Sequence, residues 1–266
     1  MTAYDYETVK FTIENGLAIL VLNRPSRLNS FNTQMHTEVK KVFKTLRKTE
    51  DLRCLLITGE GRGFCAGQDL SDRAVSVGEQ APDLGLSLEN NYNPLIRAIT
   101  QLEVPVVCAV NGVAAGAGAN IALACDLVFA ARSAAFIQSF NKLGLIPDSG
   151  GTWMLPKLIG HARAMKLCLL GEKVSASDAL EMGMIAGVYE DDELMAGVSK
   201  LVIDLAEAPT RGLGLIKRAV HLSASNTLDQ QLDLERDLQR TAGRSDDYRE
   251  GVAAFMEKRK PNYVGH

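Results

Sequence analysis

The chain of 266 residues is 46% hydrophobic and 23% charged, which is an ordinary globular composition and excludes wholesale disorder. Its formal net charge of −3 provides no global field for nucleic acid or for an anionic membrane surface. The first ten residues contain no basic segment followed by an apolar one, and no apolar stretch reaches the length of a membrane span. We therefore expect a cytoplasmic protein that binds neither nucleic acid nor membrane.

The cysteines and histidines favour neither a disulfide framework nor a metal centre. Five cysteines are widely spaced and lie mostly in apolar segments, which indicates reduced thiols. Four histidines are scattered along the chain without a CxxC or HExxH motif, so we expect no metal site.

The first third of the chain is rich in predicted strands. Residues 9–22 alternate around a glycine, which predicts a hairpin, and residues 54–58 form a short apolar run typical of a buried strand. Between them, residues 33–49 carry apolar side chains with a 3.6-residue period, which predicts an amphipathic helix capped by Asn32 or Thr33.

The middle of the chain repeats a pattern of strand, glycine-rich loop and helix. Residues 73–88 show no period and are predicted to be a variable segment, whereas residues 90–102 have helical spacing that ends before Pro105. The elements predicted next are a strand at 106–110, a helix at 119–124, strands at 126–130 and 136–137, and a helix from about residue 149. These repeats predict an α/β core.

The last third of the chain is predicted to be helical. The segments with helical spacing are 163–170, 176–182, 192–206, 210–223, 227–241 and 246–258. A leucine stripe in this tail exceeds what one face of the core needs, so we expect a homotrimer or hexamer. The stripe consists of Leu228, Leu232, Leu234 and Leu238.

Three loops rich in small residues carry the candidate site: Gly61–Leu70, Asn111–Asn120 and Leu143–Thr152. Small residues after a strand let backbone N–H groups approach a ligand closely, and two such loops suggest a pair of donors aimed at one oxygen, an oxyanion hole. The second loop lacks the third glycine and the acidic residue of a dinucleotide-binding fingerprint.

Two side chains in these loops allow both a chemical and a structural interpretation. Cys65 has the chemistry of a nucleophile, but no histidine is near it in sequence, so we interpret it as a small buried thiol. Asp148 stands immediately before a predicted helix, where it either caps the helix or acts as an acid/base group.

The three loops, in this order and spacing, resemble those of the enoyl-CoA hydratase/isomerase (crotonase) superfamily over nearly the whole chain. The resemblance implies an α/β fold, with a spiral of β-β-α repeats at residues 1–200 and a C-terminal helical trimerisation region at residues 201–266. It also implies an acyl-CoA substrate, with coenzyme A as part of that substrate and no separate cofactor. Carried over by position, the two oxyanion donors are the backbone N–H groups of Ala66 and Ala117.

The departures from the family pattern indicate isomerisation. Hydratases of the family use two glutamates, and the matching positions here are Asn120 and Phe140, neither of which can take a proton. Asp148 matches a position where several isomerases of the family keep an acidic residue, so the resemblance favours catalysis over capping. In an apolar pocket the pKa of this carboxylate should be raised.

A closer resemblance is to one subfamily, the bacterial isomerases of phenylacetate degradation, and rests on residues 27–32, 61–72, 81–85, 143–153 and 226–251. It implies conversion of ring-1,2-epoxyphenylacetyl-CoA to its oxepin form and a shift of 3,4 double bonds of enoyl-CoA to the 2,3 position.

The alternative functions are an enoyl-CoA hydratase/isomerase of fatty acyl-CoA, a non-enzymatic RNA-binding relative and a serine hydrolase. The RNA-binding alternative needs a comb of lysines, but those of the first helix are interpreted as a solvated face.

The predicted substrate-binding residues come from the loops and from the tail of a neighbouring chain. Those of the loops and their surroundings are Arg27, Leu28, Ala66, Gly67, Gln68, Asp69, Leu70, Gly116, Ala117, Phe140, Asn141 and Trp153. Phe255 and Lys258 of a neighbouring chain are expected near the nucleotide end of coenzyme A.

Overall fold

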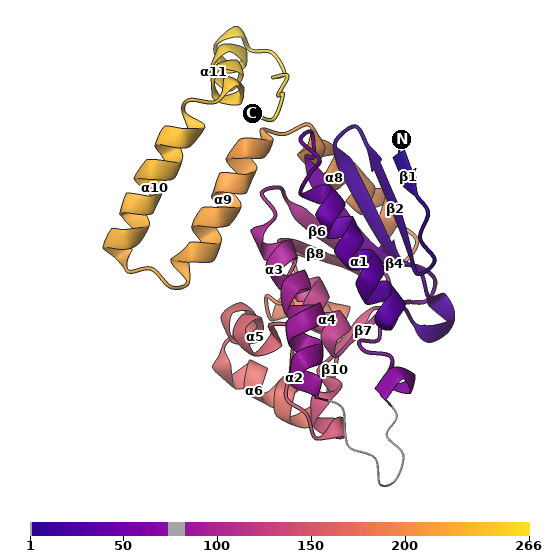
Figure 1. The fold of residues 1–266 in the computed structure, drawn as a ribbon. Coiled ribbons are helices and arrows are strands. Elements are labelled where there is room, and N and C mark those ends of the chain that lie inside the picture. Colours follow the sequence, from indigo (N-terminus) through magenta and orange to yellow (C-terminus); the bar gives the residue numbers. More distant parts are fainter. Residues whose placement is uncertain (1, 74–82) are drawn as a thin grey trace.

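The computed structural model describes residues 2–73 and 83–266. These residues form two β-sheets covered by helices, with C-terminal helices that project from one end (Figure 1). Residues 74–82 lie outside the described residues, and with them most of the segment predicted to be variable and part of the motif at 81–85.

The larger sheet has seven strands within the described residues, in the order β1, β2, β3, β4, β6, β8 and β11. They are β1 (Thr2–Tyr4), β2 (Val9–Glu14), β3 (Leu17–Leu22), β4 (Cys54–Gly59), β6 (Val106–Val110), β8 (Leu127–Ala131) and β11 (Gly187–Tyr189). The first three pair antiparallel, and the other neighbours pair parallel. The predicted hairpin is confirmed, because Val9 pairs with Leu22 and Glu14 pairs with Leu17.

The smaller sheet has four strands within the described residues: β10 (Lys173–Ser175), β9 (Ala135–Ile137), β7 (Val113–Ala115) and β5 (Gly63–Cys65), in that order. Three successive turns of the chain each give one strand to each sheet and then a helix. The turns are β4–β5–α3 (Asn93–Gln101), β6–β7–α4 (Ala117–Leu123) and β8–β9–α5 (Gly151–Ile159). This confirms the predicted spiral. The strands β5 and β7 lie inside segments predicted as loops, because three residues are too few to show an alternation.

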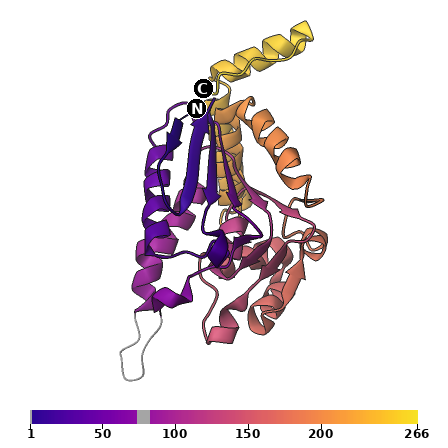
Figure 2. The same cartoon turned by 90° about the vertical axis from the view of Figure 1, so that its right-hand side faces the viewer.

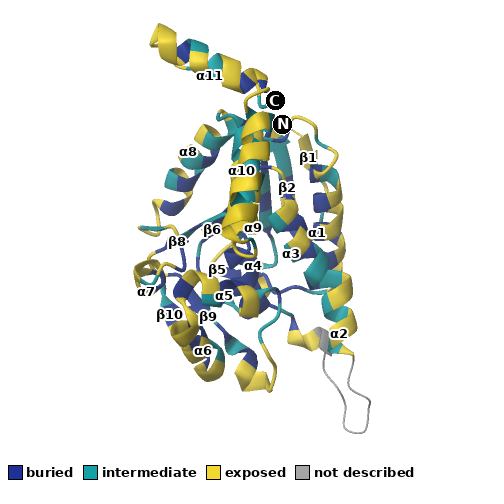
Figure 3. Cartoon of the chain, turned by 90° about the vertical axis from the view of Figure 1, so that its left-hand side faces the viewer, coloured by how far each residue is buried: buried dark blue, intermediate teal, exposed yellow. Residues whose placement is uncertain are grey.

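Helices cover both faces of the larger sheet. α1 (Thr33–Leu46) and α3 lie on one side of it and α8 (Leu194–Ala206) lies on the other (Figures 2 and 3). α1 is capped by Asn32, whose side chain accepts a hydrogen bond from the Met35 N–H at 2.9 Å. The apolar side chains that α1 buries are Met35, Val39, Val42, Phe43 and Leu46, and they account for its 3.6-residue period.

Two helices begin two residues away from their predicted starts. α4 begins at Ala117 and α5 begins at Gly151, because the positive φ of Gly116 (φ +53°) and of Gly150 (φ +78°), which glycine adopts readily, marks each start. The remaining helices are α2 (Leu84–Ser87), α6 (His161–Leu170), α7 (Ala176–Glu181), α9 (Thr210–Ser223), α10 (Leu228–Ala242) and α11 (Asp246–Glu257). A π-helical turn at Leu88–Tyr92 precedes α3.

The helical tail is attached to the core through a partly buried ion pair. The Lys217 Nζ of α9 lies 2.8 Å from the carboxylate of Asp126 and donates to the carbonyls of Ile99 (3.0 Å) and Val104 (3.3 Å). α10 runs beside α9 without burying a side chain, and α11 projects further from the core (Figure 1). The predicted boundary at residue 200 lies within α8, where Val202 is buried.

A carboxylate on α1 holds the chain that enters β2. Glu38 is only 3% exposed and accepts hydrogen bonds from the N–H groups of Glu7 (3.0 Å) and Thr8 (2.8 Å), from the Thr8 hydroxyl and from the Gln34 amide (2.8 Å). Burial by itself raises the pKa of Glu38, but the hydrogen bonds from Thr8, Glu7 and Gln34 together outweigh it and leave the pKa below the ordinary 4.5.

Replacing this carboxylate, in Glu38→Gln, is expected to lower the free energy of unfolding by about 1–3 kcal/mol at neutral pH, because buried N–H groups lose a charged acceptor. Since the folded-state pKa lies below the unfolded one, the carboxylate stabilises the fold above the unfolded pKa, and this contribution is lost as the pH falls through the folded pKa. Urea denaturation of both proteins from neutral pH down to about pH 3 measures the difference, which should shrink on acidification. The exposed Glu50→Gln serves as the control, and equal stability of Glu38→Gln and the parent at neutral pH would contradict the assignment.

Candidate active site

The first and second glycine-rich loops touch through their backbones. A Cβ atom on Gly67 (φ +86°) would lie 2.9 Å from the Ala115 carbonyl oxygen and 3.3 Å from the Ala117 nitrogen. A Cβ atom on Gly118 would lie 2.3 Å from the Cys65 carbonyl oxygen. Any side chain at these two positions would force the loops apart, so the glycines are required for the contact.

The Ala117 N–H is placed to receive a ligand oxygen. Ala117 is the first residue of α4, and the preceding N–H, that of Gly116, donates to the Ile137 carbonyl at 2.9 Å. Within residues 2–73 and 83–266, the Ala117 N–H has no protein acceptor. The first N–H groups of a helix have no partner inside the helix and favour negative charge, which suits a developing oxyanion.

The predicted role of the Ala66 N–H is wrong in this structure. It donates to the Leu28 carbonyl at 2.9 Å and so fixes the loop against the chain after β3. A hydrogen bond already made at this length leaves the donor directed at protein and not at a ligand. The sequence motif could not show this, because the acceptor lies 38 residues earlier in the chain at Leu28.

The next N–H along the loop, that of Gln68, points the other way. The Gly67 carbonyl accepts from the Phe31 N–H at 2.7 Å, and a trans peptide directs its N–H opposite to its carbonyl. The Gln68 N–H therefore points away from Phe31. β7 lies on that side, because it pairs with the other edge of β5 and then leads into Ala117.

The side chains of the first loop hold the loop itself. The Gln68 Oε1 accepts from the Tyr92 hydroxyl at 2.9 Å. Asp69 accepts from the N–H (3.1 Å) and hydroxyl (2.6 Å) of Ser71 and pairs with Arg24 at 2.9 Å. The Ser71 hydroxyl and the Arg24 guanidinium lower the pKa of Asp69 against the effect of burial. Asp69, predicted to bind substrate, is thus an ionised anchor of the loop.

Asp148 does not cap α5. The cap position belongs to Gly150, which makes no side-chain cap, and two residues in the left-handed region, Ser149 (φ +50°) and Gly150, separate Asp148 from the helix. The Ser149 hydroxyl, itself buried, donates to the Asp148 carboxylate at 2.9 Å. The capping interpretation is therefore wrong, and the carboxylate is held beside a strained turn.

Asn120 ties Asp148 to the second loop. Its Nδ2 donates to the Asp148 carbonyl at 2.8 Å, and its Oδ1 accepts from the Gln138 Nε2 at 2.8 Å. A Cβ atom on Gly151 would lie 2.3 Å from the Asn120 Nδ2, so only glycine permits this approach. The position that carries a glutamate in the hydratases of the resembling family thus holds a buried amide.

Of the binding residues predicted in and near the third loop, one lies against the second loop and two do not. Phe140 is buried, with its ring 3.7 Å from where a Cβ atom of Gly116 would stand, so it lies against the second loop. Asn141 turns away, because its Nδ2 donates to the Leu169 carbonyl at 2.8 Å. Trp153 is half exposed, with the Lys157 ammonium 3.1 Å from its ring centre.

The predicted binding residues in and near the first loop differ in exposure. Leu70 and Arg27 are exposed, and Leu28 is half-buried.

Phe255 and Lys258 lie at the C-terminal end of α11, far from the loops of their own chain (Figure 1). Phe255 is 82% exposed, and Lys258 has a left-handed backbone (φ +55°). Their expected contact with coenzyme A requires a neighbouring chain and stays a prediction.

Cys65 is a structural thiol. It is fully buried, and burial raises the pKa of the thiol to about 12. A thiol with this pKa carries almost no thiolate near neutral pH and is a poor nucleophile. The interpretation of Cys65 as a small buried side chain is confirmed.

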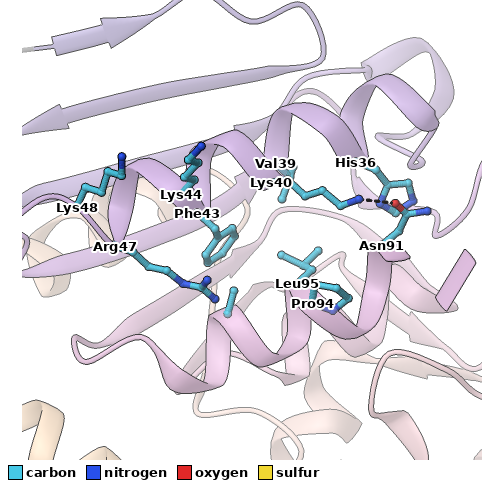
Figure 4. Close-up of a pocket in the computed structure, with 11 residues that line it drawn as sticks. His36, Val39, Lys40, Phe43, Lys44, Arg47, Lys48, Asn91, Pro94 and Leu95 are labelled. Carbon is cyan, nitrogen blue, oxygen red and sulfur yellow. Dashed lines mark hydrogen bonds between the residues drawn. The ribbon is translucent and has the colours of Figure 1, made fainter. Parts of the chain in front are cut away.

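A separate groove of about 270 Å³ lies between α1 and α3 (Figure 4). Its floor is apolar, with Phe43 and Leu95, and its rim is basic, with Lys40, Lys44 and Arg47. None of the predicted site residues lines it.

In the described part of the chain, no group of three His, Cys, Asp or Glu side chains is arranged to hold a metal ion. Across residues 2–73 and 83–266, every helix is too short or too polar to cross a membrane.

Two buried amides that shape the site were not singled out from sequence. Asn29 (φ +56°) accepts from the Arg24 N–H at 2.8 Å and donates to the Gly63 carbonyl at 2.8 Å, and so aligns the first loop with the chain after β3. Gln138 orients Asn120. The only local signal was a polar residue beside an apolar strand, which is equally typical of a surface position.

The chain matches the family described as Enoyl-CoA hydratase/isomerase over residues 12–266. It is 58% identical to the 1,2-epoxyphenylacetyl-CoA isomerase of Escherichia coli (strain K12), over 95% of this chain and 97% of that protein. It is 33% identical to the trans-2-decenoyl-[acyl-carrier-protein] isomerase of Streptococcus mutans, over 98% of this chain and 99% of that protein. The crystal structure of an enoyl-CoA hydratase from Bacillus anthracis superimposes with a TM-score of 0.91 at 29% identity, covering 98% of this chain and 100% of that one.

Proposed function

Because the chain belongs to the enoyl-CoA hydratase/isomerase family, we propose that it is an acyl-CoA isomerase that acts on ring-1,2-epoxyphenylacetyl-CoA through one carboxylate, Asp148. The observation that carries this proposal is the replacement of both hydratase acid/base positions, one by the buried amide of Asn120 and one by the phenyl ring of Phe140. The 58% identity to an isomerase of this substrate supports the choice of substrate.

The proposed oxyanion hole consists of the N–H groups of Ala117 and Gln68. The contact between Gly67 and the Ala117 nitrogen brings the two loops together, and the peptide that joins Gly67 to Gln68 turns its N–H toward this side. Each donor aimed at the oxygen that gains charge in the transition state contributes about 3 kcal/mol. With the thioester carbonyl bound there, the α-carbon becomes acidic enough for a carboxylate to remove its proton.

Asp148 is proposed to take this proton and return it to another carbon of the same molecule. An isomerisation gains and loses no atoms, so one group that alternates between base and acid is sufficient, and no cofactor is needed. The Ser149 hydroxyl donates to one carboxylate oxygen at 2.9 Å and so holds the carboxylate in place. The same chemistry serves a linear 3-enoyl-CoA, in which the proton moves from C2 to C4 as the double bond moves to the 2,3 position.

Asp148→Asn is expected to keep the fold and to lose isomerisation by about 100-fold or more, because an amide cannot accept the proton while it still accepts from Ser149. The measurement is conversion of the ring epoxide and of a linear 3-enoyl-CoA by both proteins, with circular dichroism to verify folding. Asp191→Asn, an equivalent change on the surface, should leave both rates unchanged. Near-parental activity of Asp148→Asn would refute the proposed mechanism.

Hydration of crotonyl-CoA is expected to be negligible. Addition of water across a double bond needs a group to activate the water and another to protonate the α-carbon, and Asn120 and Phe140 provide neither. The loss of enoyl absorbance at high protein concentration measures this reaction. Turnover in the upper range of enzyme rates, roughly 1000 per second, would show that other residues supply the two groups.

We further propose a homotrimer or hexamer in which the tail of one chain approaches the site of the next. Support comes from apolar side chains that the tail exposes, namely Ile216, Val220, Leu228, Leu232, Val252, Phe255 and Met256. Leu234 and Leu238 of the predicted stripe are half-buried. Apolar surface of this extent is unusual on a free monomer.

Light scattering at micromolar concentration is expected to give the mass of three or six chains, and Leu228→Asp with Leu232→Asp is expected to lower that mass. These changes place charge on the exposed face of α10 and disturb no buried contact. Exposed Thr37→Asp on α1 is the matched control and should not alter the mass. A parent protein that is monomeric would contradict the assembly.

A further inference from the structure

Three polar groups form a buried line that ends at the main chain of Asp148. The Gln138 Nε2 donates to the Asn120 Oδ1 at 2.8 Å, and the Asn120 Nδ2 donates to the Asp148 carbonyl at 2.8 Å. Asn120 has no exposed surface, and Gln138 is 4% exposed. The line therefore connects β9, α4 and the turn before α5, the elements between which Asp148 is held.

The orientation of both amides follows from the carbonyl at the end of the line. A backbone carbonyl only accepts hydrogen bonds, so Asn120 must present its Nδ2 to Asp148 and its Oδ1 to Gln138. Gln138 must then present its Nε2, which leaves the Gln138 Oε1 buried and without a donor within the described residues. A buried acceptor without a partner offsets the stability gained from the one hydrogen bond that the side chain makes. Gln138 is thus poorly explained as a residue that stabilises the fold.

We propose that Gln138 is a positioning residue for Asp148 and acts through Asn120. By fixing the Asn120 amide, it holds the Asp148 carbonyl against α4 and so sets where the carboxylate stands relative to the Ala117 N–H. The turn after Asp148 is a weak support by itself, because its bond back to the Asp148 carbonyl, from the Gly151 N–H at 2.9 Å, spans two left-handed residues. This inference rests on the proposed function, since it concerns the carboxylate that the function uses.

The test is a double-mutant cycle between Gln138→Met and Asp148→Asn. Methionine keeps the length of the side chain and removes both polar groups. Gln138→Met alone is expected to lower kcat by about 10-fold with little change in KM, because a base displaced by a fraction of an ångström still leaves the substrate bound. In the Asp148→Asn background the same substitution should have no further effect, because the group that it positions is gone.

Two further measurements test whether Gln138→Met disturbs folding and whether the effect depends on the position of the substitution. The midpoint of thermal unfolding of Gln138→Met should stay close to that of the parent, as expected for a side chain with one satisfied and one unsatisfied polar atom. Gln101→Met, the same change at an exposed position, should leave kcat unchanged. Asn120→Ser, which shortens the link itself, is expected to lower kcat at least as much as Gln138→Met and to be equally silent beside Asp148→Asn.

The possible results separate this inference from the proposed function. If Asp148→Asn is inactive while Gln138→Met has parental kcat, or if the two effects multiply, Gln138 does not act through Asp148 and the inference fails. If Asp148→Asn itself is active, the proposed function fails first. A third result would also overturn the inference. If Gln138→Met loses activity together with a large fall in its unfolding midpoint, and Asn120→Ser keeps its activity, Gln138 has a structural role.

Discussion

The candidate site depends on a direct backbone contact between two loops from successive turns of the spiral. Gly67 and Gly118 have no side chains, so the first loop can approach the start of α4 to within van der Waals distance. The proposed oxyanion hole, formed by the N–H groups of Gln68 and Ala117, depends on this approach. Every other feature of the site is built around it: Asp69 and Asn29 fix the first loop, and the smaller sheet fixes the second. The constraint is steric and leaves no tolerance for a Cβ atom.

Around this fixed contact, the reaction is set by a few side chains. A carboxylate at position 120 would be an acid/base group beside the bound thioester, whereas the amide present there has become a structural link to Asp148. The buried ring of Phe140 removes a second proton carrier. Asp148 is then the carboxylate proposed for proton transfer, and a single carboxylate is suited to moving a proton within one molecule. In the proposed mechanism the scaffold and the oxyanion donors would serve hydration and isomerisation equally, so the choice between the two reactions would lie in these positions.

Much of the architecture could be predicted because it depends on local pattern. The hairpin at β2 and β3, the period of α1, the helical tail and the order of strand, loop and helix each leave a signal within about 15 residues of sequence. The glycine-rich loops and Asp148 could be singled out for the same reason, since close backbone approach needs glycine and proton transfer needs an ionisable group. Cys65 could be interpreted as a buried thiol because no histidine lies near it in sequence and small thiols are commonly buried.

Contacts between residues distant in sequence were decided only by the tertiary structure. The bond from Ala66 to Leu28 removes one predicted donor, and the pairing of Phe31 with the first loop turns the Gln68 N–H away from Phe31. The line from Gln138 through Asn120 joins segments up to 28 residues apart, and the left-handed backbone of Ser149 and Gly150 keeps Asp148 from capping α5. By itself, the sequence determined which residue types were available and where the longer strands and helices would lie. The direction of each N–H and amide was decided by the folded chain, because a hydrogen bond depends on where its partner lies in space and not on its distance along the sequence.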